Sequence, residues 1–306
     1  MTHPHAHDHH RSAEGADRRL LRIGLGLITG FLGAEVVVAV VVHSLALLAD
    51  AGHMLTDAGA LAGSLWAITL AARPVSARWS YGLKRAEILS AALNGVALVV
   101  AGGIVFVEAV RRLLHPIGVT GPAVLAVALV GVAVNVAATA VLARADRTSL
   151  NVEGAFQHIV TDAAGFIATA IAAGVIITTG FVRADSIASL VVVGLMGRAA
   201  WGLLRASGHV LLEGTPEGVD LDLVRQHLLG ADHHVLDVHD LHAWVLTSNL
   251  PAISAHVVVD DSCFADGHAP QILDALQSAL IGQFDVEHST LQLEMAGHAE
   301  HEIGSH

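Results

Sequence analysis

Two short motifs repeat inside apolar stretches of the chain, and each contains a histidine followed four residues later by an aspartate. His53 and Asp57 lie in LADAGHMLTDAGALAGSLW, and His158 and Asp162 lie in EGAFQHIVTDAAGFIATAIAAG. Because an α-helix completes one turn every ~3.6 residues, the two members of each pair share one helix face. Two such helices side by side would bring together two imidazoles and two carboxylates, a ligand set that suits Zn²⁺.

The chemistry of these four side chains limits which ions they could bind. Imidazole nitrogens favour Zn²⁺ and similar cations, whereas a purely oxygen set would favour Mg²⁺, Ca²⁺ or Mn²⁺. Two ionised carboxylates with two neutral imidazoles would neutralise one divalent cation. Ionisable residues inside apolar membrane helices are costly and usually face a partner, a cavity or an ion path. Two equivalent pairs therefore predict a functional cation site.

Further polar residues are candidates for the surroundings of this site. Asp50 precedes His53 by three residues on the same helix face. It could orient a ligand or gate the ion, or it could mark a polar helix end at the membrane surface. Glu35 and Asn135 lie in two other apolar stretches. Each could line a hydrated path or join helices through hydrogen bonds.

The composition of the chain is that of a membrane protein. Hydrophobic residues make up 54% of it and charged residues 14%, and the mean hydropathy is +0.62. A membrane-spanning helix needs roughly 17 to 25 mostly apolar residues. Such stretches occur at about 20–42, 45–71, 86–113, 122–143, 152–181 and 186–212. The sequence therefore predicts a six-helix transmembrane bundle, all α-helical, over residues 17–213.

Basic residues indicate the orientation of this bundle, because Lys and Arg favour the cytoplasmic side of a membrane. They precede the first span, lie between the second and third and between the fourth and fifth, and end the sixth: Arg11, Arg18, Arg19, Arg22, Arg73, Arg78, Lys84, Arg85, Arg144, Arg147 and Arg205. The opposite side holds Arg111, Arg112 and Arg183, which are outnumbered. Both termini are therefore predicted to be cytoplasmic, in a cell inner or plasma membrane.

Residues 214–296 predict a small cytosolic domain, because the composition changes after Glu213. VDLDLVRQHLLG has a helical apolar period, and VLDVHDLHAWVL and AISAHVVVD read as strands separated by a turn at 249–251. PQILDALQSALIGQF reads as a second helix and VEHSTLQLEM as a third strand. The order α-β-β-α-β favours an α+β domain with helices on one face of a sheet. Pairing with a second copy would help so small a core.

The two ends of the chain are predicted to be polar tails. Residues 1–16 contain His3, His5, His7, His9 and His10 and are expected to be disordered. This tail could capture metal locally or be an inert polar segment. Residues 297–306 form a second polar tail.

Several classes of partner are excluded by the same sequence. The net charge of −12, with no basic stripe, argues against nucleic acid. The single cysteine, Cys263, rules out an intrachain disulfide. No segment resembles a nucleotide-binding loop, so ATP is not expected to drive the protein.

The motifs resemble the cation diffusion facilitator family, in its zinc-transporting branch. SLALLADAGHMLTDAGALAGSLWA, WSYGLKRAEIL, FQHIVTDAAG and VHDLHAWVLTSNLPAISAHVVV carry the likeness. It implies a six-span homodimer with a ferredoxin-like, metallochaperone-like cytosolic domain that exports metal against inward proton movement. It also implies that His53, Asp57, His158 and Asp162 are the transport-site ligands. Manganese-transporting members carry Asp at both histidine positions, which disfavours manganese here.

The resemblance further implies a candidate regulatory metal site in the cytosolic domain. His239, His256 and His288 match positions where relatives hold regulatory metal, with His242 and His268 nearby. These strand histidines could also be purely structural. In RWSYGLKRAE, Trp79 and Leu83 stand where some relatives have loop histidines, so a metal site is not expected in that loop.

The function that these observations favour is proton-coupled export of a divalent cation by alternating access, with Zn²⁺ foremost. Cd²⁺, Co²⁺, Fe²⁺ and Ni²⁺ are compatible with the same ligands. The expected partners are metal ions, protons, the lipid bilayer and a second copy of the chain. An intramembrane metal-dependent enzyme is the alternative, although catalytic zinc usually keeps an open position for water. A membrane metal sensor is a third hypothesis.

Overall fold

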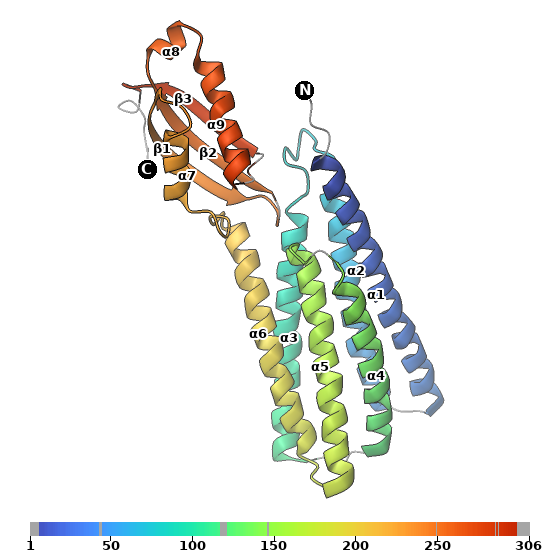
Figure 1. Cartoon of the computed structure of the whole chain (residues 1–306). Coiled ribbons are helices and arrows are strands. Elements are labelled where there is room, and N and C mark those ends of the chain that lie inside the picture. Colours follow the sequence, from blue (N-terminus) through green and yellow to red (C-terminus); the bar gives the residue numbers. More distant parts are fainter. Residues whose placement is uncertain are drawn as a thin grey trace. The chain divides into compact units, whose positions relative to one another are not determined.

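The computed structural model describes residues 6–42, 45–116, 121–145, 147–248, 250–284, 286 and 288–298. Within these ranges, side chains are described except at 6–17, 38–42, 45–53, 56, 121 and 123–124. The chain forms two compact units that divide between Gly208 and His209 (Figure 1). Each unit is treated by itself below.

The first unit is built from long helices, as the apolar stretches predict. They are α1 (Ala6–Val42), α2 (Leu45–Ala71), α3 (Ala86–Leu114), α4 (Gly121–Leu142), α5 (Leu150–Thr179) and α6 (Ala184–Leu211). Among the described residues, five of these helices are long and apolar enough to cross a membrane. The described apolar part of α2, Asp57–Ala71, is shorter. The predicted membrane bundle is confirmed.

Helix α1 begins earlier than the sequence predicted. It starts at Ala6, so residues 6–16 are helical where a disordered tail was expected, and residues 1–5 lie outside the described part. Ala, Arg and Glu, which recur in HHRSAEGADRR, are good helix formers. Extending a helix is far easier than nucleating one, so the apolar span can continue into this polar segment.

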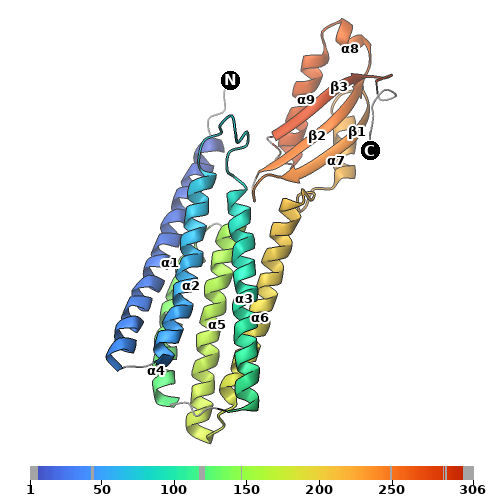
Figure 2. The same ribbon diagram turned by 180° about the vertical axis from the view of Figure 1, so that it is seen from behind.

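The helices of the bundle pack through small and branched side chains. Leu21 and Ile28 of α1, Leu61 of α2, Leu142 of α4 and Ile159 of α5 are buried in one cluster. Helix α2 contacts α1, α3 and α5, and Figures 1 and 2 show α2 and α5 from opposite sides. The two helices that carry the His-x-x-x-Asp motifs, α2 and α5, therefore both contribute to this apolar core.

One glycine lets α4 and α5 approach closely. A Cβ at Gly131 would lie 2.4 Å from the ring of Phe166, so only glycine fits under this aromatic ring. Small residues commonly permit such close helix contacts in membranes.

The second unit has the predicted α-β-β-α-β order with one added short helix. Its elements are α7 (Leu221–Leu229), β1 (Val235–Val245), β2 (Pro251–Val259), α8 (Ser262–Ala265), α9 (Ala269–Phe284) and β3 (His288–Met295). The strand order in the sheet is β1-β2-β3, with β1 antiparallel and β3 parallel to β2. Helix α9 provides the crossover that a parallel pair requires.

Helices α7 and α9 cover one face of this sheet. Val224 of α7 and Leu276 of α9 pack with Ile253, Ala255 and Val257 of β2 in one buried cluster. Because successive strand residues point to opposite faces, His256 of β2 belongs to the other face. The alternating pattern of β2 therefore separates an apolar core from a polar face.

A bulge interrupts the pairing of β1 with β2. The register shifts between His239, which pairs with His256, and His242, which pairs with Ser254. Asp240 lies within this bulge and has a positive φ of 47°, a conformation that aspartate tolerates better than most residues. Bulges re-aim side chains and often lie beside functional sites.

Candidate metal centres

A buried cluster of ionisable side chains joins α2 to α5. His158 Nε2 lies 2.7 Å from Asp57 Oδ1 and 3.8 Å from Asp162 Oδ2. The i,i+4 spacing of His158 and Asp162 places both on one face of α5, as the sequence predicted. We call Asp57, His158 and Asp162 the bundle site. Ligand atoms of all three lie within 4.8 Å of one another, close enough to share one cation.

The bundle site is almost completely shielded by the surrounding helices. His158 is 4% exposed and Asp57 is 3% exposed. Nδ1 of His158 is buried without a hydrogen-bond partner among the described residues. The imidazole Nε2 therefore lies between two carboxylates in a water-poor setting. Here a proton on the ring and a metal ion would compete for the same negative charge.

Further polar contacts join α2 to α5 and α3 two helical turns away from the bundle site. Asn151 of α5 donates a hydrogen bond of 2.9 Å to the backbone oxygen of Ser64 in α2. Asn94 of α3 donates a 3.1 Å hydrogen bond to the Ser64 hydroxyl. Ser64 lies seven residues after Asp57, and Asn151 lies seven residues before His158, so α2 and α5 run antiparallel here in one register. The role of Ser64 was not predicted, although its spacing from Asp57 places it on the same helix face.

The remaining predicted membrane residues differ in what the structure describes. His53 and Asp50 lie in α2, but their side chains are outside the described residues. Glu35 is buried in α1 and Asn135 is buried in α4. The Asn135 amide donates a 3.0 Å hydrogen bond to the Gly131 backbone oxygen of its own helix. This bond from a side chain to the carbonyl four residues earlier stays within one helix, and it assigns no ion path.

The polar face of the sheet carries another cluster, formed by one residue from each strand. His239 Nε2 of β1 lies 3.3 Å from Glu294 Oε2 of β3, and His256 Nδ1 of β2 lies 2.8 Å from Glu294 Oε1. The two imidazole rings are edge-on, with centroids 5.3 Å apart. We call His239, His256 and Glu294 the sheet site. Its ligand atoms lie within 4.8 Å of one another.

The structure brings His239 and His256 together as predicted but places His288 elsewhere. His256 pairs with Gln292, whereas His288 pairs with Ala252. Four residues of strand correspond to roughly 13 Å, so His288 is at the other end of β3 from the sheet site. Glu294 takes the third position instead. The expected set His239, His256 and His288 is therefore not assembled within one chain.

Glu294 of the sheet site and the neighbouring Asp240 were not predicted from the sequence. Glu294 is only 3% exposed, and a glutamate is rarely so buried unless its carboxylate is paired. Asp240, in the bulge, lies 4.0 Å from His256 Nε2. Little in the sequence indicated Glu294 and Asp240, because the parallel register of β2 with β3 and the bulge in β1 decide their contacts. Neither feature can be read from strand periodicity.

Comparison with known families agrees with this architecture. Residues 21–212 match the model described as "Cation efflux transmembrane domain", and residues 216–296 match "Cation efflux protein, cytoplasmic domain". The chain belongs to the cation efflux family. The resemblance drawn from the paired motifs is confirmed, as are the membrane helices followed by a small α+β domain.

Curated relatives cover nearly the whole chain. It is 36% identical over 297 residues to the "Cadmium, cobalt and zinc/H(+)-K(+) antiporter" of Bacillus velezensis, covering 96% of this chain and 93% of the relative. It is 38% identical over 293 residues to the "Metal cation efflux system protein CzcD" of Cupriavidus metallidurans, covering 95% and 90%. It is 36% identical over 295 residues to "Zinc transporter ZitB" of Escherichia coli, covering 96% and 93%.

One solved structure is similar to a quarter of the chain. The metal-bound C-terminal domain of the CzcD transporter from C. metallidurans is 36% identical, covers 25% of this chain and 99% of that domain, and has a TM-score of 0.22.

Family membership decides between the broad classes of function. This cation efflux family member is a multi-pass membrane transport protein and not an enzyme. The alternative of an intramembrane metal-dependent enzyme is thereby set aside.

Proposed function

We propose that this protein exports divalent transition-metal cations, Zn²⁺ foremost, in exchange for protons. The observation that carries the proposal is the buried contact of His158 Nε2 with Asp57 Oδ1 at 2.7 Å, with Asp162 on the same side. Nitrogen and oxygen donors in one small cluster suit Zn²⁺, Cd²⁺ and Co²⁺ better than Mg²⁺ or Ca²⁺. Relatives named for the transport of those metals support this choice.

His53 is proposed as the fourth ligand of the transported ion. Asp57 faces His158, and Ser64 contacts Asn151 in the same antiparallel register of α2 and α5. Continuing that register by one turn puts residue 53 of α2 at the level of Asp162 of α5. The complete site would then contain two imidazoles and two carboxylates.

The proposed coupling follows from competition at one site. Zn²⁺ requires neutral imidazoles and ionised carboxylates, so its binding displaces protons. Protons arriving from the outer side would reprotonate the cluster and release the metal. A bundle that exposes the site alternately to each side would thus exchange metal for protons. The B. velezensis relative, named an antiporter with H⁺ and K⁺, supports an exchange mechanism.

The arrangement around this site is proposed from the sequence. Both termini face the cytoplasm, residues 17–213 carry the transport path, and residues 214–296 form the cytosolic domain. Two copies pair through that domain, because a small domain gains buried surface from a self-complementary interface. Asp50 and Glu35 are proposed to border the path.

The sheet site is proposed to bind the same metals in a regulatory role. Two imidazoles and a buried carboxylate form a zinc-like ligand set on the uncovered face of the sheet. A cation bound there would lie between the Glu294 carboxylate and the imidazoles of His239 and His256. Any metal that binds the paired domains more tightly than the single domain would stabilise the pair.

Transport of Zn²⁺ into inverted membrane vesicles tests the proposal. We expect uptake when the vesicle interior is acidic, collapse of that uptake when an ionophore removes the proton gradient, and no response to ATP. His158→Ala should abolish uptake, whereas His115→Ala, in an exposed position beyond α3, should leave it unchanged. Uptake that is unaltered by gradient collapse would refute the coupling. Metal binding without flux would favour the sensor hypothesis.

A further inference from the structure

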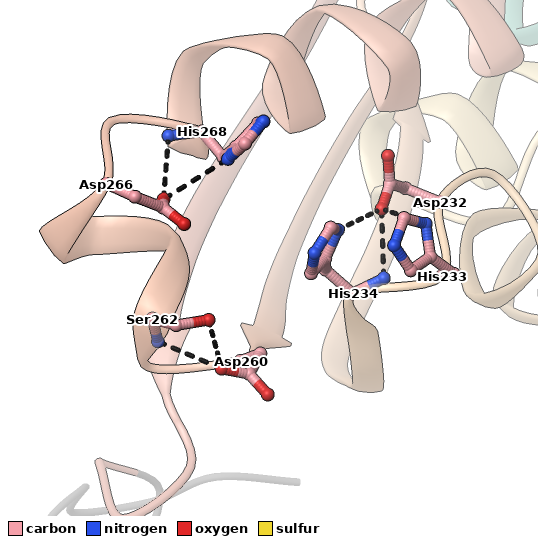
Figure 3. Close-up of polar contacts among 7 residues, drawn as sticks. All are labelled: Asp232, His233, His234, Asp260, Ser262, Asp266 and His268. Atoms are coloured by element: carbon pink, nitrogen blue, oxygen red, sulfur yellow. Dashed lines mark hydrogen bonds and ion pairs between the residues drawn. The ribbon is translucent and has the colours of Figure 1, made fainter.

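The turn that precedes β1 contains three consecutive metal-ligand residue types. Asp232 Oδ1 accepts a 2.9 Å hydrogen bond from the backbone amide of His234 and lies 2.9 Å from His234 Nδ1. The same oxygen lies 3.5 Å from His233 Nδ1 (Figure 3). We call Asp232, His233 and His234 the turn cluster. Their ligand atoms lie within 4.8 Å of one another, so one carboxylate and two imidazoles converge.

The fold brings a further imidazole to this turn. The rings of His233 and His234 have centroids 3.8 Å apart, and the His268 ring stacks at 5.9 Å from that of His234. His268 lies between α8 and α9, far along the chain from the turn cluster. Zn–N bonds are about 2.0 Å, so two imidazoles that share one ion have ring centres roughly 5 Å apart. The 5.9 Å between the His268 and His234 rings is close to this spacing.

Negative charge surrounds the same place. Loss of solvent raises the pKa of the Cys263 thiol, and the charges of Asp266, Asp260 and Asp232 raise it further, so these three carboxylates lie in the neighbourhood of the thiol. Hydrogen bonds from Ser262 hold the pKa of Asp260 below its ordinary value. The carboxylates of Asp232, Asp260 and Asp266 would attract a cation.

We propose that the turn cluster, with His268 as fourth ligand, is a second divalent-metal site on the cytosolic domain. Its nitrogen-rich set selects Zn²⁺-like cations over Mg²⁺ and Ca²⁺. It is separate from the sheet site, because His239 lies five residues after His234, roughly 15 Å along β1. The side chains of His233 and His268 are 83% and 57% exposed, so bound metal would exchange readily with solvent.

Equilibrium dialysis of the purified full-length protein against Zn²⁺ tests this site. The parent carries His158→Ala and His239→Ala, which weaken the bundle and sheet sites in every sample. On this parent, His233→Gln with His234→Gln is expected to remove one bound Zn²⁺ per chain, or to weaken its binding by at least about tenfold. Glutamine at 234 can still donate a hydrogen bond to Asp232, so the turn is retained.

A matched control removes two exposed histidines that lie outside the cluster. His115→Gln with His298→Gln should leave both the number of bound ions and their affinity unchanged. His268→Gln alone should weaken binding several-fold, and millimolar Mg²⁺ should not compete. If the double variant misfolds, His233→Gln alone decides, because the His233 side chain is 83% exposed and its replacement removes little buried contact. Equal Zn²⁺ binding in the cluster and control variants would overturn the proposal and leave a hydrogen-bonded turn only.

Discussion

The bundle site and the sheet site use similar side chains but are assembled in different ways. In the bundle, one turn of α5 separates His158 from Asp162, and the packing of α2 on α5 adds Asp57. In the sheet, each strand supplies one residue, and His239, His256 and Glu294 meet only through strand register. The bundle site has two carboxylates around one described imidazole, whereas the sheet site has one buried carboxylate for two imidazoles.

This difference has consequences for what each site can do. Two carboxylates balance the charge of a divalent cation inside a membrane, where unbalanced charge is very costly. The sheet site is partly open to solvent, with side-chain exposures of 17% for His239 and 24% for His256, so water can help to solvate a bound ion. Charge balance should therefore be decisive in the bundle and less important on the sheet.

Removing a bundle carboxylate is expected to have the largest effect. Asp57→Ala or Asp162→Ala should reduce Zn²⁺ flux in reconstituted vesicles by more than about 100-fold, since loss of one partner from a buried charged cluster costs about 3–5 kcal/mol. Asp185→Ala is the control, because this aspartate lies 3.9 Å from Arg112 at the start of α6. It should change flux by less than about twofold. Wild-type flux in either bundle variant would remove that residue from the site.

Changing a ligand nitrogen to oxygen should have the next largest effect. His53→Asp is expected to shift the preference between Zn²⁺ and Mn²⁺ by about tenfold toward Mn²⁺, because Mn²⁺ favours oxygen ligands. Competition between the two metals in vesicle uptake measures the shift. His115→Asp adds the same charge outside the cluster and should not alter the ranking. An unchanged ranking in both variants would place selectivity in other residues.

On the sheet, substitutions of Glu294 and of the distant His288 should have different effects on Zn²⁺ binding. In a His158→Ala background, Glu294→Gln should weaken Zn²⁺ binding by at least about tenfold and lessen any metal-dependent pairing of chains. His288→Ala should do neither, because His288 lies at the opposite end of β3. Zn²⁺ titration and sedimentation of the full-length protein measure both quantities. A loss of binding in His288→Ala equal to that in Glu294→Gln would show that a partner chain completes the sheet site.

The smallest expected effect is on a helix cap of the cytosolic domain. The Asp220 carboxylate accepts a 2.9 Å hydrogen bond from the backbone amide of Asp222 at the start of α7. Asp220→Ala should destabilise this helix by about 1 kcal/mol, whereas Asp220→Asn, which can still accept the bond, should cost much less. Hydrogen exchange of the α7 amides measures the change. Metal binding at the bundle site should be unaffected by either variant.

Most of the bundle could be predicted because its chemistry is local. Apolar length predicted the helices, and the spacing of His158 and Asp162 predicted their shared face. The start of α1 was predicted less well, since helical propensity carries the polar segment from Ala6 into the span. The contacts of Ser64 with Asn94 and Asn151 depend on how three helices pack, so spacing alone could not predict them.

The residue pattern alone was enough to establish the membrane bundle, its paired His-x-x-x-Asp motifs and the α-β-β-α-β order of the cytosolic domain. Each depends on periodicity along a short segment, which chain geometry converts directly into a face or an element. Only the tertiary structure replaced His288 by Glu294 in the sheet site and brought His268 beside the turn cluster. Strand register and loop packing join residues that are distant in sequence, and a one-residue shift in either would bring different side chains together.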